Sequence, residues 1–307
     1  MSSPTFSILI TTKNRKEDLA FTLSKIKYLL KNEEVVCIIC DDGSTDETAS
    51  FLQINYPDIQ LIQNKKSEGL IHSRNRLLNL ATTEFAISLD DDAHFVTENP
   101  LELIANYFVQ NPVCGLIALR IFWGLESPNK IVSNEENTRV KGFVGCAHVW
   151  RMEAWKSIPN YPDWFVFYGE EDFAAYQLFK NKWEIHYLPE VLLNHRVDVK
   201  ARKNEKDYQL RLRRSLRSGW YLYIMFYPWR VIPRRFAYSL WIQINNKVLK
   251  GDWKAALAII QAICDVIINL PRLLKNSTRL SVQEFKDYNK LPDTKLYWTP
   301  GESQLKL

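Results

Sequence analysis

Two spacings of apolar residues, one strand-like and one helical, alternate along the first 120 residues of the chain. Short apolar runs typical of buried strands fall at residues 6–10, 35–40, 59–62 and 85–89. Between them, apolar residues lie three or four positions apart, as on one face of a helix, most clearly from Leu19 to Leu30. Asn14 and Glu17 predict a capping box before that helix. Strands that alternate with helices predict a mostly parallel, Rossmann-like sheet flanked by helices.

The pattern changes twice further along the chain. Residues 124–140 are polar and predict a mobile loop. Apolar residues then return, with a helix expected at about 170–181 and a strand at about 184–188. From about residue 205 the chain becomes helical, basic and rich in aromatic residues. We therefore expect an α/β domain at 1–204, divided into halves near residue 120, and a C-terminal helical appendage at 205–307.

Three consecutive aspartates, Asp90, Asp91 and Asp92, follow directly after the strand predicted at 85–89. In an open α/β sheet, ligands bind in the crevice at the carboxyl ends of the strands. Adjacent carboxylates repel one another, so we expect a divalent cation between them. Oxygen ligands of this kind suit Mn²⁺ or Mg²⁺. The alternative is a solvated acidic turn that binds nothing.

Polar residues also follow the first two predicted strands, whose ends lie side by side in a sheet of this kind. Loop amides and short polar side chains at such a place can hold a nucleotide. A carboxylate there can accept the imide N–H of uracil, which cytosine lacks. The alternative is a pair of ordinary helix caps, because threonine, aspartate and serine are preferred at helix starts. The residues concerned are Thr11, Thr12, Asn14, Arg15, Asp41 and Asp42.

The order and spacing of these segments resemble the nucleotide-sugar-binding half of family 2 glycosyltransferases, which have the GT-A fold. The resemblance covers roughly residues 5–200 and rests on Thr11-Thr12-Lys13-Asn14-Arg15, Cys40-Asp41-Asp42-Gly43-Ser44-Thr45-Asp46, Gly69 with Ser73-Arg74-Asn75, and Leu89-Asp90-Asp91-Asp92. It implies that residues 1–120 bind the donor. The donor-binding residues that it implies are Thr11, Thr12, Asn14, Arg15, Asp41, Asp42, Arg74, Asp90 and Asp91.

Within this set the resemblance implies distinct roles. Thr11 and Asp42, or its neighbour Asp41, would meet the nucleoside. Arg74 would approach the base or the diphosphate. Asp90 and Asp92 would be the outer residues of a DxD motif, and Asp92 would be the direct metal ligand.

The resemblance continues through residues 142–195, in the acceptor-binding half at 121–204. Gly142–Cys146 and Trp150–Trp155 look like the acceptor-side strand and turn of the family, and Tyr168-Gly169-Glu170-Glu171-Asp172-Phe173 looks like its acidic motif before a helix. An inverting transfer needs one carboxylate to take the proton of the acceptor hydroxyl. Alignment places Glu171 on the usual catalytic aspartate. Because glutamate is one methylene longer, Asp172 stays a rival for this role.

Two further expectations come from the same region. Glu170 completes the acidic trio, whose alternative explanation is the preference for acids at a helix N-terminus. His195 follows a predicted strand, where related enzymes often place a metal-binding histidine. We therefore expect His195 to join Asp90 and Asp92, although a lone histidine is equally compatible with a structural role.

Charge is distributed unevenly along the chain. The net charge is +5, but residues 200–235 carry 11 Lys and Arg against two acids, so the rest of the chain sums to −4. These basic residues flank an aromatic run at 220–229, a combination typical of contact with an anionic bilayer. The alternative is a helical pair that packs on the first domain with its aromatics buried. No signature of an RNA-binding module is present, so we expect no nucleic-acid partner.

Composition indicates the compartment. The start of the chain has no basic, apolar leader of the signal-peptide kind. The apolar stretch at 255–270 is short for a transmembrane span and is interrupted by Gln261 and Asp265. Cys37 and Cys40 lie three apart in a predicted strand and so point to opposite faces. We expect a cytoplasmic protein, peripheral on the cytosolic face of the membrane, with unpaired cysteines.

Three classes of function compete for this sequence. The resemblance favours a metal-dependent inverting glycosyltransferase with a UDP-linked donor and a lipid-linked or cell-surface glycan acceptor. A sugar-phosphate nucleotidyltransferase is disfavoured because Thr11–Arg15 contains none of the glycines of a phosphate loop. A non-catalytic nucleotide-sugar-binding scaffold stays open because of the departure at Glu171.

Overall fold

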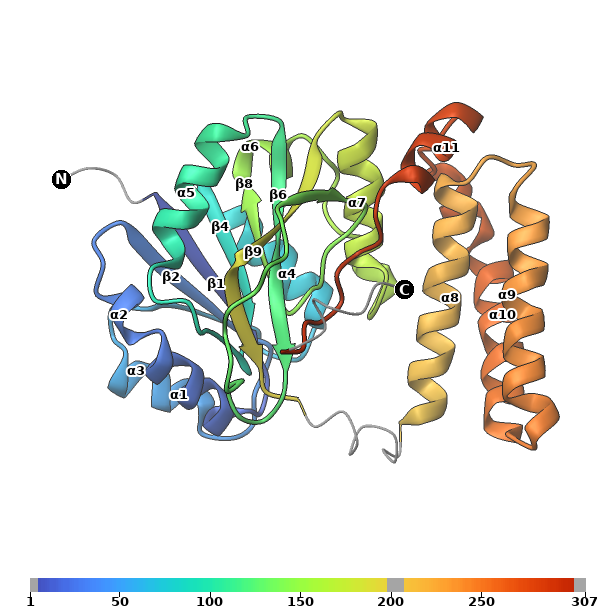
Figure 1. Cartoon of the computed structure of the whole chain (residues 1–307). Helices are drawn as coiled ribbons and strands as arrows, with labels where there is room; N and C mark the ends of the chain where they lie inside the picture. The colour runs from blue at the N-terminus through green and yellow to red at the C-terminus, as the bar shows by residue number, and fades with distance from the viewer. Residues whose placement is uncertain (1–4, 198–206, 301–307) are drawn as a thin grey trace.

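Strand β1 (Phe6–Thr12) lies in the interior of the sheet, and all seven of its residues are buried. The computed structural model describes residues 5–197 and 207–300 (Figure 1). Parallel strands flank β1 on both sides, β2 (Val35–Asp41) and β4 (Phe85–Asp90), and β3 (Gln60–Gln63) extends the sheet beyond β2. The predicted parallel α/β half is confirmed.

The second half of the sheet departs from this simple order. Strand β8 (Ala147–Arg151) lies antiparallel between β4 and β6 (Cys114–Trp123). Strand β9 (Glu184–His195) pairs parallel with β6 and is longer than the predicted 184–188. Two short strands, β5 (Ala93–Phe95) and β7 (Thr138–Val140), pair antiparallel with β9. Strand β8 is antiparallel because the segment at 124–146, which connects β6 to β8, returns the chain to the sheet from the opposite direction.

Helices cover both faces of the sheet and create two hydrophobic cores. Leu19, Leu52 and Ile104 belong to one core, and Ile71, Trp155 and Phe173 belong to the other. Cys37 lies in the first core and Cys40 in the second, as free thiols, which confirms that they point to opposite faces. The helices are α1 (Lys16–Lys25), α2 (Lys27–Leu30), α3 (Thr48–Asn55), α4 (Leu70–Leu80), α5 (Pro100–Gln110), α6 (Met152–Lys156) and α7 (Glu170–Lys180).

The capping box predicted at Asn14 is wrong. The first helix begins at Lys16 with Arg15 at its cap position, and no side chain caps it. Asn14 instead has a positive φ of 52°, a conformation that asparagine tolerates better than most residues. Its side-chain oxygen accepts a hydrogen bond from the backbone of Thr45 at 2.7 Å. Asn14 therefore ties the loop after β1 to the loop after β2.

The C-terminal region forms a helical group beside the sheet domain (Figure 1). Its helices are α8 (Tyr208–Phe226), α9 (Ile232–Asn246), α10 (Trp253–Lys275) and α11 (Val282–Lys290). Residues of α8 and α10 share one continuous core with α7. Trp220, Tyr221 and Phe226 are buried, and Phe226 stacks on Tyr176 of α7. Most of the aromatic run at 220–229 is therefore a packing element, the second of the two predicted alternatives, and only Trp229 is highly exposed.

Two details of the C-terminal region differ from expectation. Helix α10 has 23 residues, longer than the predicted 255–270, and it is the one helix in the described part of the chain with the length and composition of a membrane span. After α11 the chain returns along the sheet domain (Figure 1). There the Trp298 backbone N–H donates to the Ile121 carbonyl at 2.6 Å, and Arg120 lies over the Trp298 ring.

Candidate active site

The polar strand ends meet at one edge of the sheet, as predicted. In the register of the parallel strands, Thr11 lies beside Asp90 on one side and Cys40 on the other, and Thr12 lies beside Asp41. The chain turns immediately after β4 into β5, which pairs with the end of β9 so that Ala93 lies opposite His195. The sheet register thus delivers residues from four separate segments to a single place.

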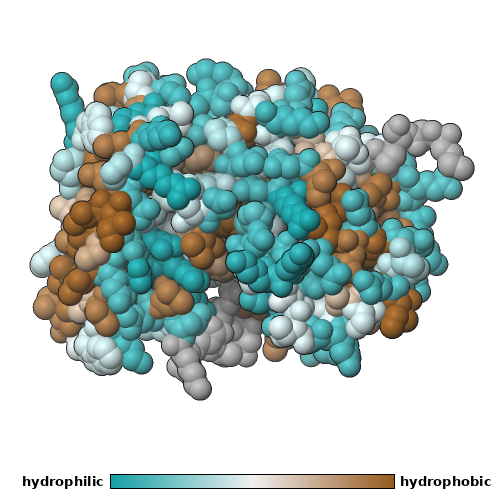
Figure 2. Space-filling model, turned by 180° about the vertical axis from the view of Figure 1, so that it is seen from behind, coloured by the Kyte–Doolittle hydropathy of each residue, from teal (hydrophilic) through white to brown (hydrophobic). Residues whose placement is uncertain are grey.

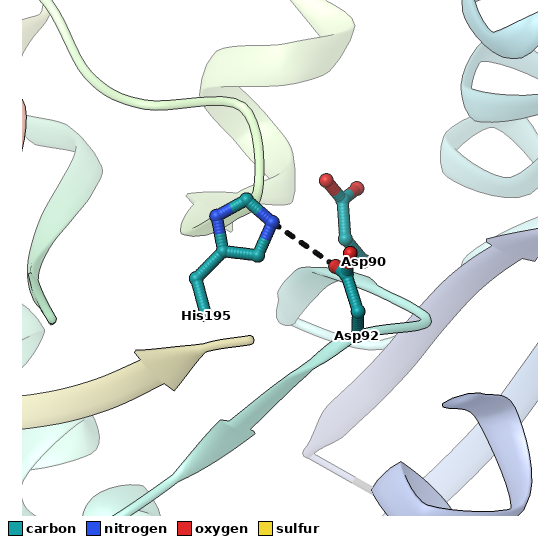
Figure 3. Close-up of side chains that lie close together, drawn as sticks. All are labelled: Asp90, Asp92 and His195. Carbon is teal, nitrogen blue, oxygen red and sulfur yellow. Dashed lines mark ion pairs between the residues drawn. The ribbon is translucent and has the colours of Figure 1, made fainter. Parts of the chain in front are cut away.

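Asp90, Asp92 and His195 form the centre of this place (Figure 3). One ligand atom from each of the three lies within 4.8 Å of the others. His195 Nε2 lies 3.0 Å from Asp92 Oδ1, and both side chains are buried. Figure 3 shows the imidazole facing the Asp92 carboxylate, with Asp90 beside it on the same turn. The structure therefore brings together the three residues that the sequence predicts as metal ligands.

The donor set fits a divalent cation. Asp92 Oδ1 is buried and accepts no well-formed hydrogen bond from any residue that the structure describes, and the same holds for His195 Nδ1 as a donor or acceptor. An unsatisfied buried carboxylate oxygen is costly unless a ligand supplies its partner. Two carboxylates suit Mg²⁺ or Mn²⁺, and the imidazole nitrogen favours the transition metal of the two.

Arg15 supplies positive charge to Asp92 and to its neighbour Asp91. Its guanidinium lies 2.8 Å from Asp92 Oδ2 and 3.3 Å from Asp91 Oδ1. Burial acts to raise the pKa of Asp92, but the nearby imidazole of His195 and the guanidinium of Arg15 lower it to about 2. Asp92 is therefore ionised throughout the physiological range, as a metal ligand must be.

Asp91 points away from this centre. Thr12 Oγ1 donates to Asp91 Oδ2 at 2.8 Å, and burial raises the pKa of Asp91 to about 7 despite the nearby Arg15. Of the three aspartates, the outer two therefore face the candidate cation, and the middle one holds the loop after β1.

The sequence did not decide whether Asp41 or Asp42 contacts the nucleoside. The structure gives the two residues different surroundings. Asp41 caps its own loop, because Oδ1 accepts the backbone N–H of Ser44. Asp42 lines a cavity with Thr11 and Thr12. Partial burial acts to raise the pKa of Asp42, but the hydrogen bonds that its carboxylate accepts lower it. Their donors are Asn64, Ser67, Ser73 and the backbone amides of Glu68 and Gly69, at 2.6–3.2 Å.

Arg74 connects the Asp90–Asp92–His195 cluster to the start of α7. Its guanidinium donates to Asp90 at 2.7 Å, to Glu170 at 2.9 Å and to the carbonyl of Gly145 at 3.0 Å. This buried network orients the carboxylate of Asp90. A Cβ on Gly145 would collide with the carboxylate of Glu171 and push it aside, so the lack of a side chain here leaves room for Glu171.

Two cavities meet at the Asp90–Asp92–His195 cluster, and we call them the smaller and the larger cavity. The smaller one, about 490 Å³, is lined by Thr11, Asp42, Asp92 and the loop after β3. The larger one, about 950 Å³, is lined by Arg74, Glu170, Glu171 and the surface of α8. Asp90, His195, Leu70 and Phe167 line both.

The acidic trio at the start of α7 is divided by this geometry. Glu170 is buried and paired with Arg74. Glu171 lines the larger cavity. Asp172 is exposed and does not line either cavity. Of the two rivals for the catalytic base, Glu171 alone faces the space shared with Asp90 and His195.

The loop before α7 is strained where the cavities meet. Val166 and Tyr168 both have φ near 70°, and Gly169 has φ of 89°. A left-handed conformation is a rare outlier for a β-branched residue such as valine, and such strain concentrates at functional sites. Between them, Phe167 reaches both cavities, so the strained loop shapes their junction.

Sequence reasoning missed the contribution of α8 to this site. Arg214 lines the smaller cavity, and Tyr208, Arg211 and Leu212 line the larger one. The run of arginines was visible in the sequence, but it suggested membrane lipid. Tertiary packing alone places α8 beside the two cavities. Helical spacing therefore does not distinguish the residues that line the cavities from Arg213, which pairs with Asp265.

Replacing Arg214 with alanine tests this assignment. A guanidinium that reaches a diphosphate makes charge-assisted hydrogen bonds of about 1.5–3 kcal/mol, so we expect nucleoside diphosphate to bind roughly tenfold to a hundredfold more weakly. Uridine, which has no phosphate, should bind equally to both proteins. Isothermal titration calorimetry measures both ligands, and Arg234→Ala, an exposed arginine on α9, is the matched control. Equal diphosphate affinity in the two variants would remove Arg214 from the site.

Comparison with known proteins identifies the family. The model of glycosyl transferase family 2 matches residues 7–167, slightly more than half of the chain. The chain belongs to this family. The matched range contains the strand ends around Thr11, Asp42 and Asp90, whereas α7, His195 and the C-terminal helices lie outside it. The family resemblance seen in the sequence is thus confirmed.

Two bacterial relatives each match part of the chain. A β-1,3-glucosyltransferase of Escherichia coli, WfaP, is 36% identical over 93 residues, which are 30% of this chain and 36% of WfaP. The glycosyltransferase YfnE of Bacillus subtilis, described as uncharacterized, is 30% identical over 124 residues, 38% of this chain and 31% of YfnE. The matched segments therefore span well under half of either relative.

Solved structures show the same fold. The structure of GalNAc-T7 with UDP, GalNAc and Mn²⁺ has a TM-score of 0.57 at 14% identity and covers 73% of this chain and 48% of that one. The mannosyltransferase PcManGT of Pyrobaculum calidifontis, in complex with GDP-Man and Mn²⁺, has a TM-score of 0.54 at 15% identity and covers 94% and 84%. The GT-A fold predicted from the sequence is confirmed.

Proposed function

We propose that this family 2 member is a metal-dependent inverting glycosyltransferase. The observation that carries the proposal is the Asp90–Asp92–His195 cluster, which lies at the junction of two cavities with Glu171 on the wall of the larger one. The smaller cavity would hold the nucleotide-sugar donor and the larger one the acceptor. Mn²⁺ or Mg²⁺, when bound by the cluster, would stabilise negative charge on the diphosphate leaving group.

The chemical step needs one base. In an inverting transfer the acceptor hydroxyl attacks the anomeric carbon, the bond from that carbon to the diphosphate breaks, and the hydroxyl proton passes to a carboxylate. Glu171 would take this proton, because it faces the larger cavity. Arg74 and Glu170 would act as positioning residues, since their buried ion pair fixes the start of α7 relative to Asp90. The nucleoside diphosphate would leave with Arg214 near its phosphates.

The donor is proposed to be UDP-linked. Asp42 lines the smaller cavity beside Thr11, and a carboxylate accepts the imide N–H of uracil. Both oxygens of Asp42 already accept hydrogen bonds, so one donor must turn away when the base binds. The Ser67 hydroxyl, 2.6 Å from Asp42 Oδ2, is suited to this because its O–H can rotate. Thr12 and Arg15 also line the smaller cavity and would contact the donor, whereas Asn14 and Asp41 would support the nucleotide indirectly, through the two loops that they hold.

The acceptor is proposed to be a glycan hydroxyl, lipid-linked or at the cell surface. Aromatic side chains line the larger cavity, and such rings can bury the apolar faces of sugars. WfaP, a partial relative, is named for transfer from UDP-Glc to GlcNAc-diphosphoundecaprenol, a lipid-linked acceptor. The rings concerned are Trp123, Phe167, Tyr168 and Tyr208.

A nucleotide-sugar screen tests the proposed function. Thermal shift with UDP- and GDP-linked sugars should show stabilisation by a UDP-linked donor that depends on Mn²⁺, because ligand binding to the folded state raises the unfolding temperature. Release of UDP from that donor should follow, slowly without acceptor. Stabilisation without any release, with or without candidate glycans, would instead support a non-catalytic nucleotide-sugar-binding protein. Stabilisation by no nucleotide sugar would contradict both.

A further inference from the structure

The outer side of α9 and α10 exposes an unusual amount of apolar surface. On α10, exposed residues fall at helical spacing of three, four or seven positions, and Ile267 is 66% exposed. On α9, Tyr238 and Trp241 are 60% and 59% exposed. Figure 2, which shows the molecule from behind, has hydrophobic residues gathered over this end. We call this surface the outer face, and it comprises Tyr238, Trp241, Leu249, Trp253, Leu257, Ile260, Ile267, Ile268 and Leu274.

The opposite side of α10 is firmly packed. Ala255, Ala258 and Ala262 are buried and let α10 approach α8 closely. Asp265 on that side forms a two-point ion pair with Arg213 of α8, at 2.6 and 2.7 Å. A helix that crossed a bilayer alone would have to break this pair and expose Asp265 to hydrocarbon, which is costly. One packed polar side and one exposed apolar side instead suit a helix that lies in the plane of an interface.

Charge identifies the occupant of the outer face. Residues 229–275 contain eight Lys and Arg against two acids, and both acids are engaged elsewhere. Asp265 pairs with Arg213, and Asp252 caps α10 and accepts a hydrogen bond from Tyr208. A second copy of the chain docked on this face would place like charges together. An anionic bilayer would supply the missing negative charge.

A basic cavity borders the outer face. Arg230, Arg234 and Arg235 line a space of about 580 Å³ together with Tyr238. None of these arginines forms an ion pair with another residue in the described ranges 5–197 and 207–300. Three guanidinium groups around an open space match a phosphate headgroup, because arginine binds phosphate oxygens in a bidentate manner.

We propose that the enzyme rests on an anionic membrane through the outer face of α9 and α10, with the arginine cavity at lipid phosphates. The buried aromatics of α8 serve instead as the support of this face. The surface is separate from the catalytic centre, so its failure and that of the proposed transferase activity are distinguishable. The expected cytosolic location at the membrane thereby acquires a specific contact surface.

Vesicle co-sedimentation of the full chain tests the proposal. We expect binding to phosphatidylglycerol-rich vesicles and little binding to phosphatidylcholine vesicles. Ile267→Asp should weaken binding by roughly tenfold or more, because burial of an isoleucine is worth about 1.5–3 kcal/mol. Ile54→Asp, the same change at a 77% exposed isoleucine of α3, should bind like the unchanged protein. Arg234→Gln with Arg235→Gln should weaken binding about 25-fold at low salt, which corresponds to about 1 kcal/mol per charge.

Two results would overturn the proposal. The first is equal binding of the Ile267→Asp and Ile54→Asp variants to anionic vesicles. The second is a lipid-free dimer, found by light scattering, that Ile267→Asp dissociates, because the face would then belong to a second copy. Circular dichroism and Mn²⁺-dependent donor binding, unchanged in Ile267→Asp, exclude misfolding as the cause of lost membrane binding.

Discussion

Replacing Asp92 with asparagine should abolish the Mn²⁺-dependent binding of nucleoside diphosphate. Asp92 is buried, its Oδ1 accepts no well-formed hydrogen bond from the described residues, and it lies 3.0 Å from His195, so its charge is available to a cation. The cation in turn offsets the charge of the phosphates, which otherwise meet three aspartates. Calorimetric titration of UDP with and without Mn²⁺ measures the effect.

The neighbouring aspartate provides the control for this experiment. Asp91→Asn is the same isosteric change one residue away, but the Asp91 carboxylate faces Thr12 and Arg15 instead of the cluster. We expect this variant to retain Mn²⁺-dependent binding. Mn²⁺-dependent affinity that survives Asp92→Asn would refute the metal assignment, and equal losses in both variants would indicate a general loss of loop structure.

Replacing Glu171 with glutamine should leave donor binding intact and slow transfer by roughly 10²- to 10⁴-fold, the usual contribution of a general base. Glutamine keeps the shape of the side chain beside Gly145 but cannot take the proton of the acceptor. The loss should appear in kcat measured with saturating acceptor, whereas the donor affinity measured by calorimetry should not change.

Asp172→Asn is the matched variant on the same turn of α7. Because Asp172 is exposed and does not line either cavity, we expect nearly unchanged transfer. The reverse result, with Asp172→Asn impaired and Glu171→Gln active, would exchange the two roles. Full activity in both variants would mean that another group accepts the proton.

The parallel half of the fold was predictable from local patterns. Strands such as β1 and β4 are continuous apolar runs, since they are covered on both faces, and the intervening helices carry apolar stripes. The position of the site was also predictable, because the carboxyl ends of parallel strands lie at the same edge of the sheet. The family resemblance then supplied roles that these patterns alone left open, such as that of Asp92.

Other features depended on contacts that no local pattern encodes. Asn14 has the residue type and spacing of a helix cap, but its link to Thr45, on a different loop, takes precedence. The aromatic run around Trp220 has the composition of a membrane belt, yet α7 and α10 bury most of it. The composition of this run predicts that its aromatic side chains are buried away from water, but it does not predict whether they contact lipid or protein.

The sequence by itself determined which residues lie at the carboxyl edge of the sheet, where the candidate active site is. Strand periodicity and parallel strand order place Thr11, Asp42 and Asp90 at that edge. Only the tertiary structure decided which of them face a shared space. It turned Asp92 toward His195 across 103 residues of chain, placed Glu171 and not Asp172 on a cavity wall, and brought Arg214 from a distant helix. Side-chain direction at a helix start or after a strand depends on packing between distant segments, and one residue of offset reverses it.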